Sequence, residues 1–166
     1  MQPDKKENIV DDVTFARALH VLGVIHWIGG LAFVTLVVLP LARSRSTAKE
    51  GLALFKTVER RFSAQVRVSV PLVGATGLWM TYRQDFWGRF VDPRFWWMGA
   101  MLGLWLVFML MVFVAEPLLH GRFEQEAQRD SGAALRAMSL LHMILLAFAA
   151  LTAFGAVAGA HGLFFL

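Results

Sequence analysis

Histidine is the residue type through which this chain could do chemistry, because it has five histidines and no cysteine. Two of them, His20 and His26, lie within residues 14–41, an apolar run long enough to cross a membrane. An imidazole is costly in hydrocarbon, so it marks either a ligand of a metal or cofactor or a hydrogen bond that joins two helices. The absence of cysteine excludes disulfides, thiolate metal sites and cysteine nucleophiles.

The histidines can be grouped in pairs that lie at similar depths in different apolar runs. His20 lies about 9 Å inside the outer end of the first run, and His161 lies near the same end of the last one. Two imidazoles at equal depth on different helices suit the axial positions of a haem, so His20 and His161 are the predicted ligands of haem b. His120 and His142 lie toward the inner end and form a candidate second site, which would make two haems. His26 lies near the middle of its run.

Helical phase favours His20 over His26 as the ligand. At 100° per residue, His20, Gly23 and Trp27 fall on one stripe, whereas His26 is about 120° away from it. A glycine one turn from a ligand leaves room for a flat macrocycle, although it also lets two helices approach closely. The small residues that surround His161 allow the same two interpretations.

Two arginines stand near the outer ends of helices. Arg17 precedes His20 by one turn, and Arg83 ends the second predicted helix on the same side. Both are candidates to neutralise the propionates of an outer haem. The alternative is that they extend to the membrane interface as ordinary long basic side chains.

Apolar runs of membrane-spanning length divide the rest of the chain. Of its 166 residues, 57% are hydrophobic, which is typical of a small integral membrane protein. The sequence predicts a single all-α domain, an up-down bundle of four transmembrane helices near residues 14–41, 62–82, 95–119 and 137–164. Glu116 with Pro117, near the inner end of the third run, is either a proton-handling carboxylate or a kink where the span ends.

The basic residues concentrate in the short connections, where the positive-inside rule accounts for them and nucleic-acid binding is not expected. The first and third connections hold nine of them, and the opposite side holds six, so both termini are predicted to lie outside the cytoplasm. The nine are Arg43, Arg45, Lys49, Lys56, Arg60, Arg61, Arg122, Arg129 and Arg136, and the six are Lys5, Lys6, Arg17, Arg83, Arg89 and Arg94.

A family resemblance rests on helices 1 and 2. The residues that carry it are Ala18, Leu19, His20, Trp27, Gly29 and Gly30, then Glu59, Arg60 and Arg61, then Gly77, Leu78 and Trp79. They resemble the bacterial membrane proteins that include the HemJ-type protoporphyrinogen oxidase and the CopD-like copper-resistance proteins. The resemblance implies a multi-pass protein of the bacterial inner membrane whose first-helix histidine, here His20, binds haem b. Where the oxidases carry Trp-Leu-His-Ala-Lys, this chain has Trp97 to Met101 without the histidine or the lysine.

Three functions remain open on the sequence. The first is a bis-histidine b-type cytochrome that transfers electrons to or from quinone, a periplasmic partner or a small oxidant, as an oxidoreductase or its subunit, alone or as a homo-oligomer. The second is CopD-like copper handling or a protoporphyrinogen-oxidase-like enzyme. The third is a cofactor-free bundle. The soft Cu(I) ligands of the copper alternative would be Met80, Met98, Met101, Met109, Met111, Met138 and Met143, beside the histidines.

Overall fold

A computed structural model describes the backbone of residues 5–163 and the side chains of residues 12–163 apart from 119, 120 and 122. This part of the chain consists of helices joined by short turns and contains no strand. The all-helical prediction is therefore confirmed.

The first helical segment is interrupted by a wider turn. It consists of α1 (Lys5–Phe33), the π-helical η1 (Val34–Val38) and α2 (Leu39–Arg43). Pro40 follows η1 at the start of α2. Proline has no N–H for the bond to residue i−4, and its ring crowds the carbonyl there, which for Pro40 lies within η1. The wider turn relieves that crowding without ending the helix.

The third helical segment also contains a π-helical turn before a proline. It consists of α4 (Trp96–Leu110), the π-helical η4 (Met111–Ala115) and α5 (Glu116–Arg129). Pro117 follows η4 at the second position of α5. The apolar run and the charged α5 therefore form one continuous helical segment, and Glu116 lies at the junction between them.

The other two long helices begin at capping side chains. The Thr47 hydroxyl accepts a hydrogen bond of 3.2 Å from the backbone N–H of Glu50 and caps α3 (Ala48–Arg83). The Asp130 carboxylate accepts one of 2.8 Å from Ala133 N–H and caps α6 (Ser131–Ala160). Two short 3₁₀ turns, η2 (Trp87–Phe90) and η3 (Pro93–Phe95), connect α3 to α4.

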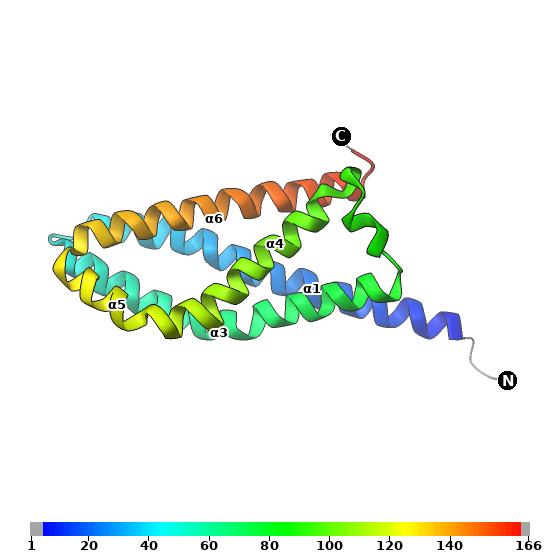
Figure 1. The fold of residues 1–166 in the computed structure, drawn as a ribbon, viewed down its shortest axis with the longest axis horizontal. Coiled ribbons are helices and arrows are strands. Elements are labelled where there is room, and N and C mark those ends of the chain that lie inside the picture. The colour runs from blue at the N-terminus through cyan, green and yellow to red at the C-terminus, as the bar shows by residue number, and fades with distance from the viewer. Residues whose placement is uncertain (1–4, 164–166) are drawn as a thin grey trace.

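The four helical segments run alternately up and down (Figure 1). The start of α1, the end of α6 and the connection from α3 to α4 lie at one end, called here the termini end. The turn at 44–47 and Asp130 lie at the other, called the Asp130 end. The helix α4 crosses diagonally from beside the end of α6 to beside the middle of α3, and α5 continues from there to the Asp130 end (Figure 1).

Two apolar clusters hold the segments together. One fills the middle of the molecule, where Trp27, Val70 and Phe108 from α1, α3 and α4 pack with Leu145 from α6. The other lies toward the Asp130 end and surrounds Phe55, whose side chain is fully buried. The described residues form no further cluster of this kind at the termini end, where α6 ends at His161.

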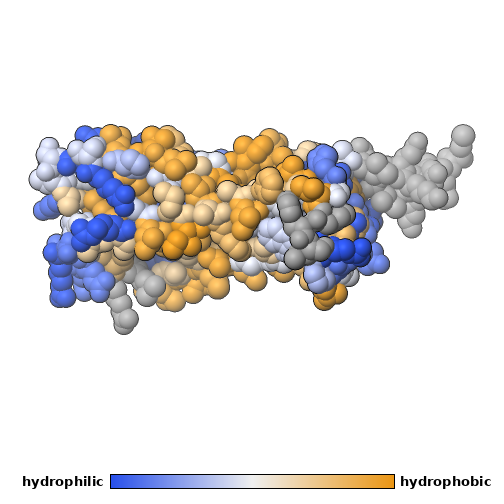
Figure 2. All heavy atoms as spheres, turned by 90° about the horizontal axis from the view of Figure 1, so that it is seen from above, coloured by the Kyte–Doolittle hydropathy of each residue, from blue (hydrophilic) through white to orange (hydrophobic). Residues whose placement is uncertain are grey.

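Three helical stretches are long and apolar enough to cross a membrane: Asp12–Arg43, Pro93–Leu118 and Ser131–Ala160. They correspond to the predicted spans 14–41, 95–119 and 137–164. On the face that Figure 2 shows, apolar residues cover the middle of the molecule between two hydrophilic ends, as lipid contact requires. The predicted span 62–82 lies inside α3, which is not among these stretches, so a fourth crossing stays a prediction.

Candidate functional site

The imidazole of His20 is held against α3. Its Nδ1 lies 2.9 Å from the carbonyl oxygen of Val73 and 3.1 Å from the hydroxyl of Thr76. A carbonyl oxygen can only accept, so Nδ1 carries the hydrogen and donates it. The lone pair of the neutral ring is therefore on Nε2, which makes no hydrogen bond with the described residues. This is the tautomer and orientation in which a histidine binds a metal through Nε2.

Glycines bring α1 and α3 close enough for this contact. A Cβ on Gly77 would lie 3.1 Å from Cε1 of His20, and a Cβ on Gly23 would lie 2.7 Å from Cγ2 of Val73. The space beside Gly23, predicted as room for a macrocycle, is therefore filled by Val73. Trp27 on the same stripe is buried in the central cluster, and its Nε1 has no hydrogen-bond partner among the described residues.

His161 lies at the termini end, as predicted from its depth, and forms the C-cap of α6. Its Nδ1 donates to the carbonyl oxygen of Val157 at 2.8 Å, so Nε2 holds the lone pair here too. The side chain is exposed, and no hydrogen bond joins it to His20. The space beside Gly155 and Gly159 is filled by the rings of Trp96 and Trp97.

The two predicted propionate partners have different surroundings. Arg83 forms an ion pair of 3.0 Å with Asp12, which ties the end of α3 to α1. Its guanidinium also lies 5.6 Å from the centroid of the Trp79 ring. Arg17 is exposed and has no ion pair with a described residue. The charge of Arg17, unlike that of Arg83, is therefore not neutralised by any carboxylate among the described residues.

The inner candidate site can be described only in part, because the side chain of His120 lies outside the described residues. His142 is buried, and its Nδ1 donates to the carbonyl of Met138 at 2.9 Å. Its ring packs edge-on against Phe55 at 5.6 Å between centroids. Apolar packing accounts for the position of His142.

His26 has the opposite tautomer. Its Nε2 lies 3.0 Å from Oε1 of Gln65 on α3, which takes the nitrogen that would otherwise bind a metal. The side chain is exposed, whereas Gly23 and Trp27 on the stripe of His20 are buried. His20 and His26 both contact α3, so the choice between them by helical phase stays a prediction.

The donor atoms present suit the ligation of a haem iron better than the binding of a bare metal ion. No group of three or more histidine or acidic side chains that could hold an ion occurs among the described residues. A haem iron needs only one or two protein ligands, because the macrocycle supplies four. The braced His20, with Nε2 unpaired, meets that requirement on the α1–α3 side.

Sequence reasoning missed a charged seam between α3 and α5. Glu116 accepts hydrogen bonds from Ser63 (2.7 Å) and from Arg67 (3.1 Å), so it does more than mark the end of a span. Burial raises the pKa of the Glu59 carboxyl to about 7, the charge of Glu116 adds to the rise, and Lys56 opposes it. The spacing of 56, 59, 63 and 67 along one helical face was the available signal.

Comparisons of the chain with protein-family models, with curated proteins and with solved structures found no match.

Proposed function

We propose that this protein is a membrane b-type cytochrome whose haem iron is bound by Nε2 of His20. One observation carries the proposal. Nδ1 of His20 donates to the carbonyl of Val73 on the neighbouring helix, and Nε2 is left unpaired. Histidines that bind a metal nearly always donate their other nitrogen to a carbonyl or carboxylate, which fixes the ring and raises its basicity.

His161 is proposed as the second axial ligand. It is the C-cap of α6, and its Nδ1 is likewise engaged by a carbonyl while Nε2 has no partner among the described residues. Its exposed position at the C-cap of α6 leaves the ring free to turn toward an iron. Two histidine ligands fill both axial positions, which suits electron transfer and disfavours oxygen binding. The buried His142 lies in the other half of α6 and does not share this setting.

The bound haem would supply one-electron redox chemistry. The chain's own residues orient it: Val73 and Thr76 fix the His20 ring, and Gly77 admits that ring against α3. Arg17, exposed three residues before His20, is the cation available for a propionate at this end. Arg83 supports the same end through Asp12 and is not needed as a direct partner.

The membrane arrangement proposed for this function has four crossings, with α3 as the fourth. Polar side chains in the predicted span of α3 are paired with neighbouring helices, as Gln65 is with His26 and Arg67 with Glu116. Pairing of this kind lowers the cost of polar groups in lipid. The basic residues of the connections and the family resemblance support a bacterial inner membrane with both termini outside. Quinone or a periplasmic protein would then exchange electrons at the outer face.

Visible absorbance of the purified protein tests the proposal. A b-type cytochrome gives a Soret band and sharp reduced α and β bands, and pyridine haemochrome analysis identifies haem b. His161→Ala should lose the low-spin spectrum while Met143→Ala, an exposed residue elsewhere on α6, keeps it. Copper without haem would favour the CopD-like alternative, and a colourless protein prepared from haem-supplied cells would reject both.

A further inference from the structure

Four side chains of α3 form a polar stripe that faces the third helical segment. Lys56, Glu59, Ser63 and Arg67 follow one another at intervals of three or four residues, so they share one helical face. Three of them bind carboxylates of α5. Lys56 pairs with Glu124 at 2.6 Å, and Ser63 and Arg67 hold Glu116 at 2.7 Å and 3.1 Å.

Glu59 is the member of the stripe that has no hydrogen bond or ion pair with a described residue. It is partly buried, one turn from the serine that binds Glu116. Burial raises the pKa of its carboxyl to about 7, helped by the charge of Glu116 and opposed by Lys56. Two carboxylates that repel each other in a partly buried seam resist double ionisation, and the one without a donor among the described residues takes the proton.

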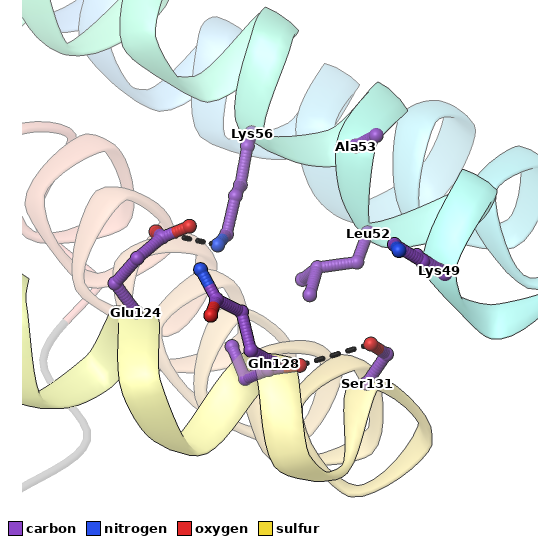
Figure 3. Close-up of a pocket in the computed structure, with 8 residues that line it drawn as sticks. Lys49, Leu52, Ala53, Lys56, Glu124, Gln128 and Ser131 are labelled. Atoms are coloured by element: carbon purple, nitrogen blue, oxygen red, sulfur yellow. Dashed lines mark hydrogen bonds and ion pairs between the residues drawn. The ribbon is translucent and has the colours of Figure 1, made fainter.

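Water can reach this seam from the Asp130 end. A hollow of about 500 Å³ lies between α3 and α5, and Lys56 and Glu124 are part of its wall. Figure 3 shows the Lys56 ammonium reaching across the hollow to Glu124, with Gln128 beside them and Lys49 farther along α3. Glu59 lies one turn along α3 from Lys56, the lining residue of the hollow that is nearest to it in the sequence.

Few other titratable groups face the seam. His142 of α6 packs on Phe55, one turn before Glu59, and its Nδ1 is engaged by its own helix. Between Arg17 and Arg43, the first helical segment has no charged residue, and His26 is bound to Gln65. The side chains of His120 and Arg122 on α5 lie outside the described residues.

We propose that Glu59 and Glu116 form a proton-binding site in the α3–α5 seam, which takes up one proton through the hollow at the Asp130 end. The carboxylate of Glu59 accepts the proton from hydronium in the water of the hollow and becomes a neutral acid, and water is left behind. Glu116 stays ionised because Ser63 and Arg67 both donate to it. The site requires no haem, so its test is independent of the test of the proposed cytochrome.

Labelling with dicyclohexylcarbodiimide tests the site, because this apolar reagent modifies protonated carboxyls in membrane proteins. Peptide mass mapping of the whole protein in lipid vesicles should find the adduct on Glu59 at about pH 6 and at least about tenfold less at about pH 8.5. Glu59→Gln should lose it. Glu50, an exposed acid on the first turn of α3, is the internal control for reaction outside the seam.

A second variant tests the pairing. Glu116→Gln removes the charge but keeps an oxygen for Ser63, so the labelling midpoint of Glu59 should move to lower pH. Infrared titration of the protonated-acid carbonyl band gives the wild-type midpoint without any variant. Absence of Glu59 labelling and of that band at about pH 6 in the folded wild type would overturn the proposal. A midpoint unchanged in folded Glu116→Gln would overturn the pairing of the two acids.

Discussion

Replacing Glu59 by glutamine should stabilise the folded protein increasingly as the pH rises. The pKa of the Glu59 carboxyl rises from its ordinary value of 4.5 to about 7 on folding, chiefly because the side chain is buried and secondly because Glu116 is near. A raised pKa means that the folded state holds the proton more tightly than the unfolded state does. The resulting stability is complete below about pH 4.5 and is lost as the pH rises through about 7.

The size of the effect follows from the same numbers. The rise from 4.5 to about 7 corresponds to about 3 kcal/mol of unfolding free energy, at roughly 1.4 kcal/mol per pH unit. Glutamine resembles the neutral acid in shape and hydrogen bonding, and it does not titrate. The variant should therefore match the wild type near pH 4.5 and exceed its unfolding free energy by up to about 3 kcal/mol near pH 8.

Equilibrium unfolding in detergent micelles, followed by helical circular dichroism at a series of pH values, measures this difference. Glu126→Gln is the control, because Glu126 is an exposed acid on α5 that does not line the hollow. A difference between Glu59→Gln and the wild type that stays constant between about pH 4.5 and pH 8 would refute the reasoning.

Two further substitutions test the contacts that position the helices. Gly51→Ala should lower the unfolding free energy by about 1–3 kcal/mol, because its Cβ would meet the backbone oxygen of Ala42, whereas Gly29→Ala, with no atom within 4 Å, should not destabilise; chemical unfolding compares the two. Arg83→Gln should cost about 1 kcal/mol by breaking the pair with Asp12, and the loss should shrink at high salt in the same assay; a salt-independent loss would point to packing instead.

The helices themselves were accessible to sequence reasoning, because apolar content and length decide membrane-spanning stretches. The stripe of His20, Gly23 and Trp27 was also accessible, since helical phase depends only on spacing. The same spacing cannot say what fills the space beside a glycine. Val73 comes from a helix some 50 positions later in the chain, and only the packing of α3 on α1 brings it to Gly23.

The sequence did not predict which polar side chains pair with each other across helices. The sequence of α3 shows no partner for Arg83, whereas the packing of α1 places Asp12 beside it. In the sequence, Glu116 marks the end of a span. In the structure the helical segment continues through the π-helical η4 into α5, and Ser63 of α3 donates a hydrogen bond to Glu116. The partner of each charge is therefore fixed by the crossing of helices, which periodicity within one helix does not determine.

The same dependence applies to the haem proposal. Depth predicted that His20 and His161 share one end of the molecule, and that pairing stays a prediction: the structure places His161 at the C-cap of α6 and His20 against Val73 and Thr76 of α3. The bond from Nδ1 of His20 to Val73, which leaves Nε2 as the donor to a metal, could not be predicted from α1 alone. That bond distinguishes His20 from His26, whose Nε2 is already engaged by Gln65.

The haem-to-protein ratio of purified His20→Ala, measured beside the wild type and His26→Ala, tests the central claim most directly. The account predicts haem in the wild type, undiminished haem in His26→Ala and its loss in His20→Ala, with all three proteins showing the same helical circular dichroism. Full haem occupancy with an unchanged low-spin spectrum in a folded His20→Ala protein would contradict it.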